Sequence, residues 1–567
     1  PIIEKQEDFM GNYLNPGNDM FYKMVHSEIY VDKTGLIGYC NHVINTMQRY
    51  ICVSRPRRFG KTLNMDMLKC FFSNQYRDQG QLFEGLNIWK EEKYQQLQGT
   101  YPVIYLSFAD VKQTNYKDAV LKIKKIITDV YQQYIELAGW EGLTEVQVRQ
   151  FQSVDPYMDD VTAQCALKDL SGYLYRYYEK KVIILLDEFD TPMQEAYIHG
   201  YWDEFTAFIR SLFNAAFKTN PYLNRAMMTG ITRVSKESIF SDLNNLKVVT
   251  TTSEEYATCF GFTQEEVFTA LEEFQLAGQK DAVKQWYDGF TFGSQRDIYN
   301  PWSITNYLKE KKLLAYWAST SSNDLINRLI QTSKPDVKEF MEELLNEREI
   351  VLNFDEQIVF DQLETKENAI WSLMVASGYL KIDKIEYRGI LHVPWYHLKI
   401  TNLETLGMFS EMFVGWFQNT RSNYNAFIKA MLCGNIKEMN AYMNEVALAT
   451  FSSFDTGSHP SGRTQPERFY HGFVLGLLVE LRDQYEVRSN RESGYGRYDV
   501  MLIPRQKNQL AFVLEFKVYD AQEELKLEDT VQSALVQIEE KDYDTELIER
   551  GISKSKIRHY GFAFEGK

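Results

Sequence analysis

The feature that most constrains this chain is a strand, a loop and a helix start over Ile51–Leu63, ICVSRPRRFGKTL. The apolar strand ends at Val53, and Gly60-Lys61-Thr62 opens the helix. A helix N-terminus presents free backbone N–H groups and a partial positive charge, so this order of elements suits a bound phosphate. The pattern predicts that Lys61 contacts the β- and γ-phosphates of a nucleotide and that Thr62 holds Mg²⁺.

The motif is incomplete, because Arg55 stands where the full phosphate-loop pattern has glycine. A second half of the site is therefore sought in Lys181–Asp190, KVIILLDEFD, whose apolar run predicts a central parallel strand. Asp187 and Glu188 follow at its carboxyl end, where ligands bind in open α/β sheets. Asp187 is expected to hold Mg²⁺ and Glu188 to activate the attacking water. The alternative is a buried strand that ends in two acids by chance.

Strands alternate with helices over the first 260 residues, which predicts a parallel sheet with right-handed crossovers. Further strands are expected at 29–31, 101–108 and 225–231, and helices at 35–47, 63–72, 116–137, 163–178 and 202–217. The polar segment TGITRVSKESIFSDLNNL follows the last of these strands, where a γ-phosphate sensor is expected. Thr232 and Arg233 are the candidate sensors, reporting to Ser238, Asp242 and Asn244; capped turns are the alternative reading.

The rest of the chain divides by composition. A helical lid is expected over 261–320 and a mostly helical middle region over 321–450 with a short strand pair. The segment 452–465, SSFDTGSHPSGRTQ, has the Gly, Ser and Pro content of a linker. The sequence therefore predicts four parts in order: a domain over 1–260, the lid, the middle region and a C-terminal α/β domain over 466–567.

A formal net charge of −16 argues against a protein that coats polyanions generally, so any nucleic-acid contact needs a local basic patch. The six cysteines include no Cys-x-x-Cys pair, which suits a reducing compartment. The first residues show no signal pattern, and no apolar run approaches the ~18 residues that span a bilayer. We expect a cytoplasmic protein without a membrane partner.

A second group of chemical residues lies in the C-terminal domain. Alternation along the strand 512–517, FVLEFK, places Glu515 and Lys517 on one face, and a hairpin with the strand 498–502 brings Asp499 beside them. Two carboxylates and a lysine suit phosphodiester hydrolysis, in which the acids hold Mg²⁺ or Mn²⁺ and the lysine orients water. Glu480, in the apolar helix 467–484, needs a partner. The alternative is an edge hairpin with ordinary charges.

Two further features flank that site. Gln537 and Lys541 lie four apart on a helix expected over 529–541 and could support the site or a backbone phosphate, although a solvated face is an equal alternative. A local basic patch is formed by Arg488, Arg491, Arg497, Arg505 and Lys507.

The motifs resemble a bacterial family that joins an AAA-like ATPase domain to a C-terminal PD-(D/E)XK nuclease domain. The resemblance rests on SRPRRFGKT, VIILLDEFD, TGITRVSKESIFSDLNNL and FYHGF…SNRESGYGRYD…EFK…ALVQIEEKDY. It implies that the ATPase positions are Lys61, Thr62, Asp187 and Glu188. It implies that the nuclease core is Asp499, Glu515 and Lys517, with Glu480 and Gln537 in support. AAA-like ATPases often complete their site with a neighbour's arginine, which leaves a homo-oligomer open and makes Arg57, Arg58 and Arg233 candidates.

The leading hypothesis is a nucleotide-regulated, metal-dependent nuclease, with ATP and Mg²⁺ (or Mn²⁺) as cofactors and DNA or RNA as substrate. Roles in genome defence or mobile-DNA processing are what this architecture suggests. A signalling or scaffold ATPase whose nuclease-like domain only binds nucleic acid or protein is the second hypothesis. A nucleotide-binding switch that hardly hydrolyses is the third.

Overall fold

The computed structural model describes residues 19–42, 49–231, 246–318, 324–333, 335–356, 363, 368–415, 421–454, 465–493, 496–506, 508–519 and 524–564. The chain forms two compact units, and each draws on separate segments of the sequence. The first runs to Trp317 and adds Asn353–Lys381, whereas the second takes Ala318–Leu352 and continues from Ile382. The expected middle region, 321–450, is thus divided between them.

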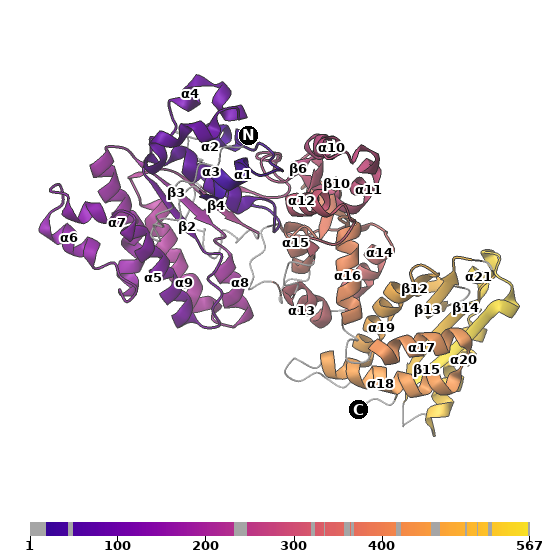
Figure 1. Ribbon diagram of the computed structural model, residues 1–567. Helices are drawn as coiled ribbons and strands as arrows, with labels where there is room; N and C mark the ends of the chain where they lie inside the picture. The colour runs from indigo at the N-terminus through magenta and orange to yellow at the C-terminus, as the bar shows by residue number, and fades with distance from the viewer. Residues whose placement is uncertain are drawn as a thin grey trace. The chain divides into compact units, whose positions relative to one another are not determined.

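The first unit is built on a five-stranded parallel sheet of order β2-β3-β4-β1-β5 (Figure 1). This confirms the α/β fold predicted from the alternation of strands and helices. Its strands are β1 (Tyr50–Ser54), β2 (Val103–Ser107), β3 (Val182–Asp187), β4 (Leu223–Gly230) and β5 (Leu246–Val249). The expected strand at 29–31 is wrong, since these residues lie outside any strand.

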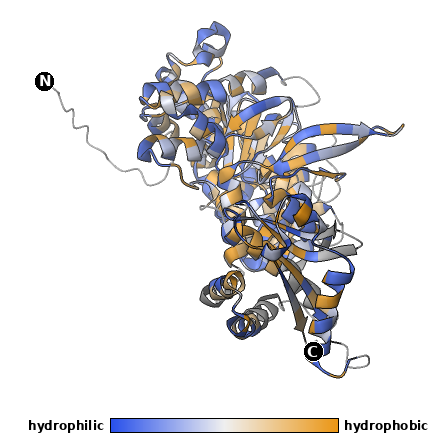
Figure 2. Ribbon diagram, turned by 90° about the vertical axis from the view of Figure 1, so that its right-hand side faces the viewer, coloured by the Kyte–Doolittle hydropathy of each residue, from blue (hydrophilic) through white to orange (hydrophobic). Residues whose placement is uncertain are grey.

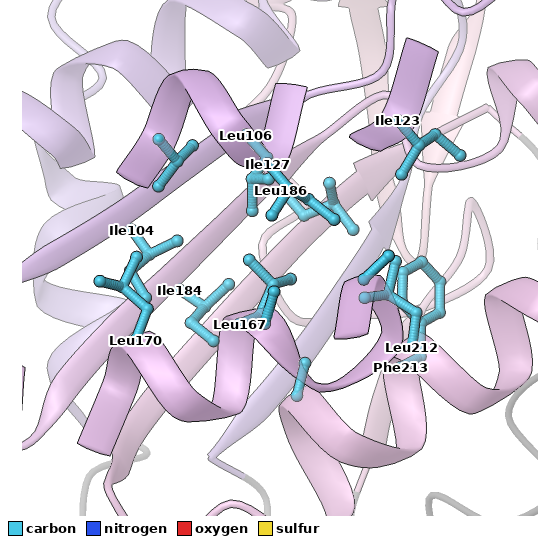
Figure 3. Close-up of a cluster of buried hydrophobic side chains, with 14 of the residues drawn as sticks. Ile104, Leu106, Ile123, Ile127, Leu167, Leu170, Ile184, Leu186, Leu212 and Phe213 are labelled. Atoms are coloured by element: carbon cyan, nitrogen blue, oxygen red, sulfur yellow. The ribbon is translucent and has the colours of Figure 1, made fainter. Parts of the chain in front are cut away.

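Helices cover both faces of this sheet, because successive strand residues point to opposite faces and both sets are apolar. On one face, Ile104 and Leu106 of β2 and Ile184 and Leu186 of β3 belong to an apolar cluster with residues of the covering helices (Figure 3), among them Ile123, Ile127, Leu167, Leu170, Leu212 and Phe213. The other face packs against α3 and its neighbours. The helices are α1 (Asp19–Val25), α2 (Gly35–His42), α3 (Lys61–Phe72), α4 (Glu92–Gln95), α5 (Tyr116–Gln132), α6 (Glu145–Gln152), α7 (Asp160–Tyr178), α8 (Thr191–Ile198) and α9 (Trp202–Phe213).

The expected lid contains a small sheet as well as helices. Strand order is β6-β8-β7, and the apolar cluster around Tyr287 and Tyr299 packs the helices on it. Sequence periodicity did not predict this sheet, because its strands are too short to show alternation. The elements are β6 (Phe262–Thr263), α10 (Gln264–Glu273), α11 (Lys280–Tyr287), β7 (Phe290–Phe292), β8 (Gln295–Tyr299) and α12 (Pro301–Glu310), with α15 (Ala369–Ala376) returning later in the chain.

The second unit holds two sheets. One has the order β10-β11-β9 and the other, mixed in direction, the order β12-β13-β14-β15. The strands are β9 (Ile350–Leu352), β10 (Leu380–Arg388), β11 (Val393–Ile400), β12 (Tyr485–Ser493), β13 (Gly496–Pro504), β14 (Ala511–Val518) and β15 (Ile557–Phe564). The helices are α13 (Asp324–Thr332), α14 (Pro335–Leu345), α16 (Leu403–Gly415), α17 (Arg421–Cys433), α18 (Ile436–Phe454), α19 (Gln465–Leu481), α20 (Leu527–Glu540) and α21 (Thr545–Glu549).

A membrane-spanning helix is not found in the described part of the chain, where every helix is too short or too polar to cross a bilayer.

Candidate functional site

The phosphate loop joins β1 to α3. Gly60 stands just before the helix with φ of 75°, a left-handed conformation that glycine adopts without strain. Arg58 has φ of 65°. These turns bring the chain into the first turn of α3, whose free N–H groups suit an anion.

Lys61 is buried, and its ammonium is held by the loop itself. Nζ donates hydrogen bonds to the carbonyl oxygens of Arg55 at 3.1 Å and Pro56 at 2.9 Å. Burial lowers the pKa of Lys61, while the nearby carboxylates of Glu188, Asp190 and Asp187 raise it. The loop therefore holds the Lys61 ammonium at the end of the sheet. There, phosphate oxygens could replace the two carbonyl oxygens as its hydrogen-bond acceptors.

Asp187 lies at the carboxyl end of β3 and is fully buried. Thr62 Oγ1 donates to Asp187 Oδ2 at 2.7 Å, and Thr229 Oγ1 donates to Oδ1 at 2.5 Å. Burial raises the pKa of Asp187, and the two threonine hydrogen bonds oppose that rise. The structure thus brings Thr62 and Asp187 together. Thr229, on the intervening strand β4, was not predicted as a site residue, although a polar residue at the end of an apolar strand marks it.

Glu188, the expected catalytic base, follows Asp187 with φ of 48°, an uncommon conformation for a residue other than glycine. Its Oε2 accepts a hydrogen bond from Thr191 Oγ1 at 3.2 Å. The buried Asp190 accepts a hydrogen bond from the N–H of Ile231 at 2.9 Å. A Cβ on Gly230 would meet Asp190 Oδ1 at 2.6 Å, which explains the glycine at the end of β4. The backbone therefore holds Glu188 beside Lys61.

Arg55, where glycine was expected, points away from the phosphate loop. Its buried guanidinium donates to the carbonyl oxygens of Ser54 at 2.9 Å and Thr250 at 2.8 Å. It also stacks over the ring of Phe292, 4.3 Å from the centroid. The departure from the usual motif is therefore structural, because this side chain ties the loop to the segment after β5 and to β7.

The other basic candidates differ in placement. Arg57 Nη2 lies 3.4 Å from Gln194 Oε1. The backbone carbonyl oxygen of Arg57 accepts a hydrogen bond from Asn300 Nδ2 at 3.2 Å. Arg58 is exposed, with its guanidinium 4.7 Å from the centre of the Trp302 ring. Thr232 and Arg233, with Ser238, Asp242 and Asn244, lie outside the described residues.

A cavity of about 570 Å³ opens beside Gly60 in the first unit. Its wall is mainly apolar, and it lies between the residues that precede β1, the start of α3 and the lid. The residues that line it include Tyr30, Val31, Gly60, Asn64, Phe262 and Trp302. Its size and its position next to the phosphate loop suit a nucleobase and its sugar.

The second cluster lies on the four-stranded sheet of the second unit. The β13–β14 register pairs Val500 with Leu514, so Asp499 and Glu515, one step further, are neighbours. Asp499 Oδ2 accepts the backbone N–H of Phe516 at 2.7 Å. The strand pairing therefore brings the two expected metal ligands together.

Gln537, on α20, links the remaining side chains. Its Oε1 accepts a hydrogen bond from Lys517 Nζ at 2.8 Å, while Nε2 donates to Glu515 Oε1 and, at 3.1 Å, to Tyr543 Oη. Glu515 and Lys517 consequently share one face of β14, with Gln537 above it. Tyr543, buried beneath Gln537, was missed because nothing in a loop tyrosine predicts that it packs back onto the helix.

Glu515 is the more deeply buried of the two carboxylates in this cluster. Glu515 is 4% exposed, and its Oε2 has no hydrogen-bond partner among the residues that the structure describes. Burial, and then the charge of Asp499, raises the pKa of Glu515 to about 8. Burial raises the pKa of Asp499 to about 6, against the hydrogen bond from Phe516 and the charge of Lys517. The two carboxyls thus raise each other's cost of ionisation, which is common where carboxylates share a functional site.

Among the remaining candidates of this domain, Glu480, Arg488 and Arg505 are described. Glu480 is partly buried near the end of α19, and within the described chain it has no hydrogen bond to the cluster. Arg488 is paired with Glu546 and Glu486, both at 2.6 Å, so its charge is already matched. Arg505 donates to the carbonyl oxygen of Arg482 at 2.9 Å. The side chains of Arg491, Arg497 and Lys507 lie outside the described part.

Both sites fit a hard divalent cation. Oxygen donors are what Mg²⁺ and Mn²⁺ prefer, and each site supplies carboxylate or hydroxyl oxygens at the end of a strand. In the second unit the buried, unpartnered oxygen of Glu515 is the observation that favours a metal. In the first unit Thr62 and Asp187 are the donors, and their mutual hydrogen bond would open to admit one.

Comparison with known proteins supports both halves. Residues 17–240 match the family described as predicted AAA-ATPase, and residues 465–567 match the PD-(D/E)XK nuclease superfamily. The two-domain resemblance seen in the motifs is therefore confirmed. The chain is also similar to a protein of Azotobacter chroococcum mcd 1, described as an uncharacterized protein in the vnfD 5' region. The two are 24% identical over 547 residues, which is 92% of this chain and 90% of that protein.

Proposed function

We propose that this chain is a nucleotide-regulated, metal-dependent nuclease. In this proposal, ATP binding or hydrolysis in the first unit controls phosphodiester cleavage of DNA or RNA by the second. The observation that carries the proposal is the cluster of Asp499, Glu515, Lys517 and Gln537, with one buried carboxylate oxygen left without a partner. A purely structural cluster would gain nothing from such an oxygen, because an unsatisfied buried polar atom costs about 1–3 kcal/mol.

In the nuclease reaction, Asp499 and Glu515 would hold the cation, which lowers the pKa of a bound water and neutralises charge on the phosphate. Lys517 would stabilise the negative charge that develops on the phosphate oxygens. Gln537 holds Lys517 and Glu515 by its two amide atoms, so it fixes their separation. Tyr543 anchors Gln537 from below.

In the ATPase reaction, Lys61 would exchange the carbonyl oxygens of Arg55 and Pro56 for phosphate oxygens. Thr62 and Asp187 would hold Mg²⁺, and Glu188 would take a proton from the attacking water. Thr229 keeps Asp187 oriented. The base and sugar would occupy the cavity beside Gly60, with Trp302 and Phe262 supplying aromatic surface.

Coupling between the two reactions is supported by an aromatic path inside the first unit. Phe59 of the phosphate loop packs edge-on against Phe290, 4.8 Å between centroids. Phe290 packs against Trp317 at 5.7 Å, and Trp317 against Tyr379 at 5.6 Å. Trp317 is the last residue before the chain enters the second unit, and Tyr379 immediately precedes β10, which enters it again. Movement of the loop on nucleotide binding would be felt at two of the three points where the chain passes from one unit to the other.

The test is cleavage of mixed DNA and RNA by the purified full chain, with Mg²⁺ or Mn²⁺ and with or without ATP. Lys517→Ala is expected to lower the cleavage rate by about 10²–10³-fold, because it removes charge stabilisation of the transition state. ATP turnover is expected to be unchanged.

The matched control is Lys554→Ala, which removes an exposed lysine just before β15 and should leave cleavage unchanged. Cleavage that survives Lys517→Ala would contradict the nuclease assignment. Cleavage that ignores ATP would contradict the coupling and leave two independent activities.

A signalling or scaffold ATPase is the second candidate, with a C-terminal domain that only binds nucleic acid or protein. The acidic net charge and the neutralised Arg488 favour it. It predicts nucleic-acid or protein binding without metal-dependent cleavage under any nucleotide condition. A role in genome defence or mobile-DNA processing belongs with the nuclease, and it would be tested by loss of protection against invading DNA in cells carrying Lys517→Ala.

A further inference from the structure

The β10–β11 hairpin has an apolar tip with no packing role in its own fold. Ile390 is 97% exposed and Leu391 is 86% exposed at the turn, and Tyr387 nearby is 63% exposed. Figure 2 shows the two strands continuing together past the rest of their sheet to a hydrophobic turn. Only Tyr396, His397 and Leu398 of β11 pair with β9, so the outer part of the hairpin stands as two strands.

The stem of this hairpin is stiffened by contacts between its own side chains. Arg388 donates two hydrogen bonds to Glu386, at 2.9 and 3.1 Å, and lies 4.4 Å from the centre of the Trp395 ring. Lys399 Nζ donates to Asp383 at 2.8 Å. These contacts restrain the two strands, which suits a tip that keeps its shape when it meets a partner.

The stem is also fixed to the unit that holds the nuclease-like cluster. His397 lies 2.6 Å from Glu349, next to β9. The helix before β9, α14, packs on α19, and Asn346 at its end donates to the carbonyl oxygen of Val487 on β12 at 3.3 Å. The hairpin is therefore held by the same framework as the four-stranded sheet.

The charges of the hairpin favour a polyanion over a neutral partner. Its two acids, Asp383 and Glu386, are each paired with a cation of the hairpin. The hairpin carries four cations, Lys381, Lys384, Arg388 and Lys399, against these two acids, and the exposed Lys384 belongs to neither pair. In a chain with a net charge of −16 this is a local basic surface around an apolar tip.

The size of the tip separates a nucleic-acid partner from a protein partner. A specific protein interface buries about 800 Å² on each side, and two aliphatic side chains with a tyrosine supply only a small part of that. A wedge between two base steps needs only one or two apolar side chains such as Ile or Leu, flanked by cations that contact phosphates.

We propose that the β10–β11 hairpin is a nucleic-acid wedge, in which Ile390 and Leu391 unstack bases while Lys384 contacts the backbone. This proposal rests on the proposed function, in that it takes nucleic acid as the substrate. It adds that the substrate is a duplex, or a structured strand, that must be opened or kinked.

The test uses the full chain carrying Lys517→Ala, so that substrate stays intact, and a DNA duplex containing 2-aminopurine, whose fluorescence rises when it unstacks. The parent protein is expected to raise the fluorescence. Adding I390S and L391S should abolish that rise and weaken binding by at least about tenfold, the loss expected when an apolar anchor is removed. I390M with L391M should retain it, because methionine also wedges.

Ile436→Ser, at an exposed position of α18, is the matched control and should behave as the parent. A serine double variant that unstacks and binds like the parent overturns the wedge while leaving the nuclease proposal intact. A parent protein that binds nucleic acid without unstacking it also overturns the wedge alone, whereas a wild-type chain that neither binds nor cleaves any nucleic acid overturns the proposed function, and the wedge with it. Loss of a stable protein complex in the serine variant, with unstacking retained, overturns the wedge in favour of protein docking.

Discussion

Asp187 and Glu515 both stand near the carboxyl end of an apolar strand, and both are buried. Their surroundings differ. Each oxygen of Asp187 accepts a hydrogen bond from a threonine hydroxyl, at 2.7 and 2.5 Å. Glu515 has one oxygen bound by Gln537 and the other without a partner among the described residues. The first carboxylate is built into its fold before any ligand arrives, whereas the second is left for a ligand to complete.

This difference suits a switch and a catalyst respectively. A site whose groups hydrogen-bond to one another is stable without nucleotide. These groups can exchange partners when nucleotide binds, and the free energies of the two states then differ only modestly. In the proposed nuclease, a buried carboxylate with an unmatched oxygen is costly until a cation binds, and the rest of the sheet must supply that stability.

The largest effect is expected from Glu188→Gln. The amide cannot accept the proton of the attacking water, so ATP turnover should fall by about 10²–10⁴-fold. Nucleotide binding should persist, because Lys61 and the loop are unchanged. Single-turnover ATP hydrolysis and nucleotide titration measure the two quantities.

Glu84→Gln, an exposed change of the same kind, is the control for Glu188→Gln and should hydrolyse ATP normally. If Glu188→Gln still hydrolyses ATP at the wild-type rate, Glu188 is not the catalytic base of the first unit.

The next effect tests whether the second site depends on its scaffold. Gln537→Leu removes both hydrogen bonds that hold Lys517 and Glu515, and loss of such outer partners typically costs about 10–100-fold in activity or metal affinity. The cleavage rate and the Mn²⁺ concentration for half-maximal cleavage should both change. Gln532→Leu, exposed on the same helix, should change neither. Normal cleavage by Gln537→Leu would mean that the strand alone positions the two side chains.

Much of this comparison could be read from the sequence. Lys61, Thr62 and Asp187 were predicted from the strand–loop–helix order, and the pairing of Asp499 with Glu515 from hairpin alternation. Both predictions rest on local geometry, in which a strand ends and side chains on alternate positions share a face. Arg55 could not be read in this way, because its carbonyl partner at Thr250 lies 195 residues away.

Contacts between residues distant in sequence also explain the wrongly predicted strand at 29–31 and the site residues that were missed. Ile29-Tyr30-Val31 has a strand composition, but it lines the cavity beside α3, where tertiary packing overrides propensity. Thr229 and Tyr543 become functional candidates only when β4 lies beside β3 and when the loop after α20 folds back on it. Sequence therefore predicted the ligands of each site better than the groups that hold those ligands.

A smaller effect concerns stability in the first unit. Asp187→Ala leaves the hydroxyls of Thr62 and Thr229 without their acceptor, and such a loss destabilises by about 1–3 kcal/mol. The midpoint of the first unit's thermal transition should fall in the absence of nucleotide. An unchanged or raised midpoint would show that the cost of burying this carboxylate exceeds what its hydrogen bonds return, and the contrast with Glu515 would disappear.

The last effect should appear in the second unit, with the opposite sign. The pKa of Glu515 in the fold, about 8, lies above its ordinary value of 4.5. Folding therefore favours the protonated carboxyl, and this contribution to stability is complete below about pH 4.5 and lost as the pH rises through about 8. In metal-free protein, Glu515→Gln should match the wild type at pH 5 and exceed it at pH 9, because the amide never ionises.

Metal should reverse this order, since Mn²⁺ replaces the proton on wild-type Glu515 and restores the charge balance. Thermal unfolding at pH 9 should show wild type stabilised by Mn²⁺ and the Gln variant scarcely affected, and chelation should return wild type to its lower midpoint. Glu546→Gln would be a poor control, because that carboxylate pairs with Arg488, so the exposed Glu528→Gln is used instead. A Gln variant less stable than wild type at pH 9 without metal would mean that Glu515 Oε2 is satisfied after all, and that the second site is as complete as the first.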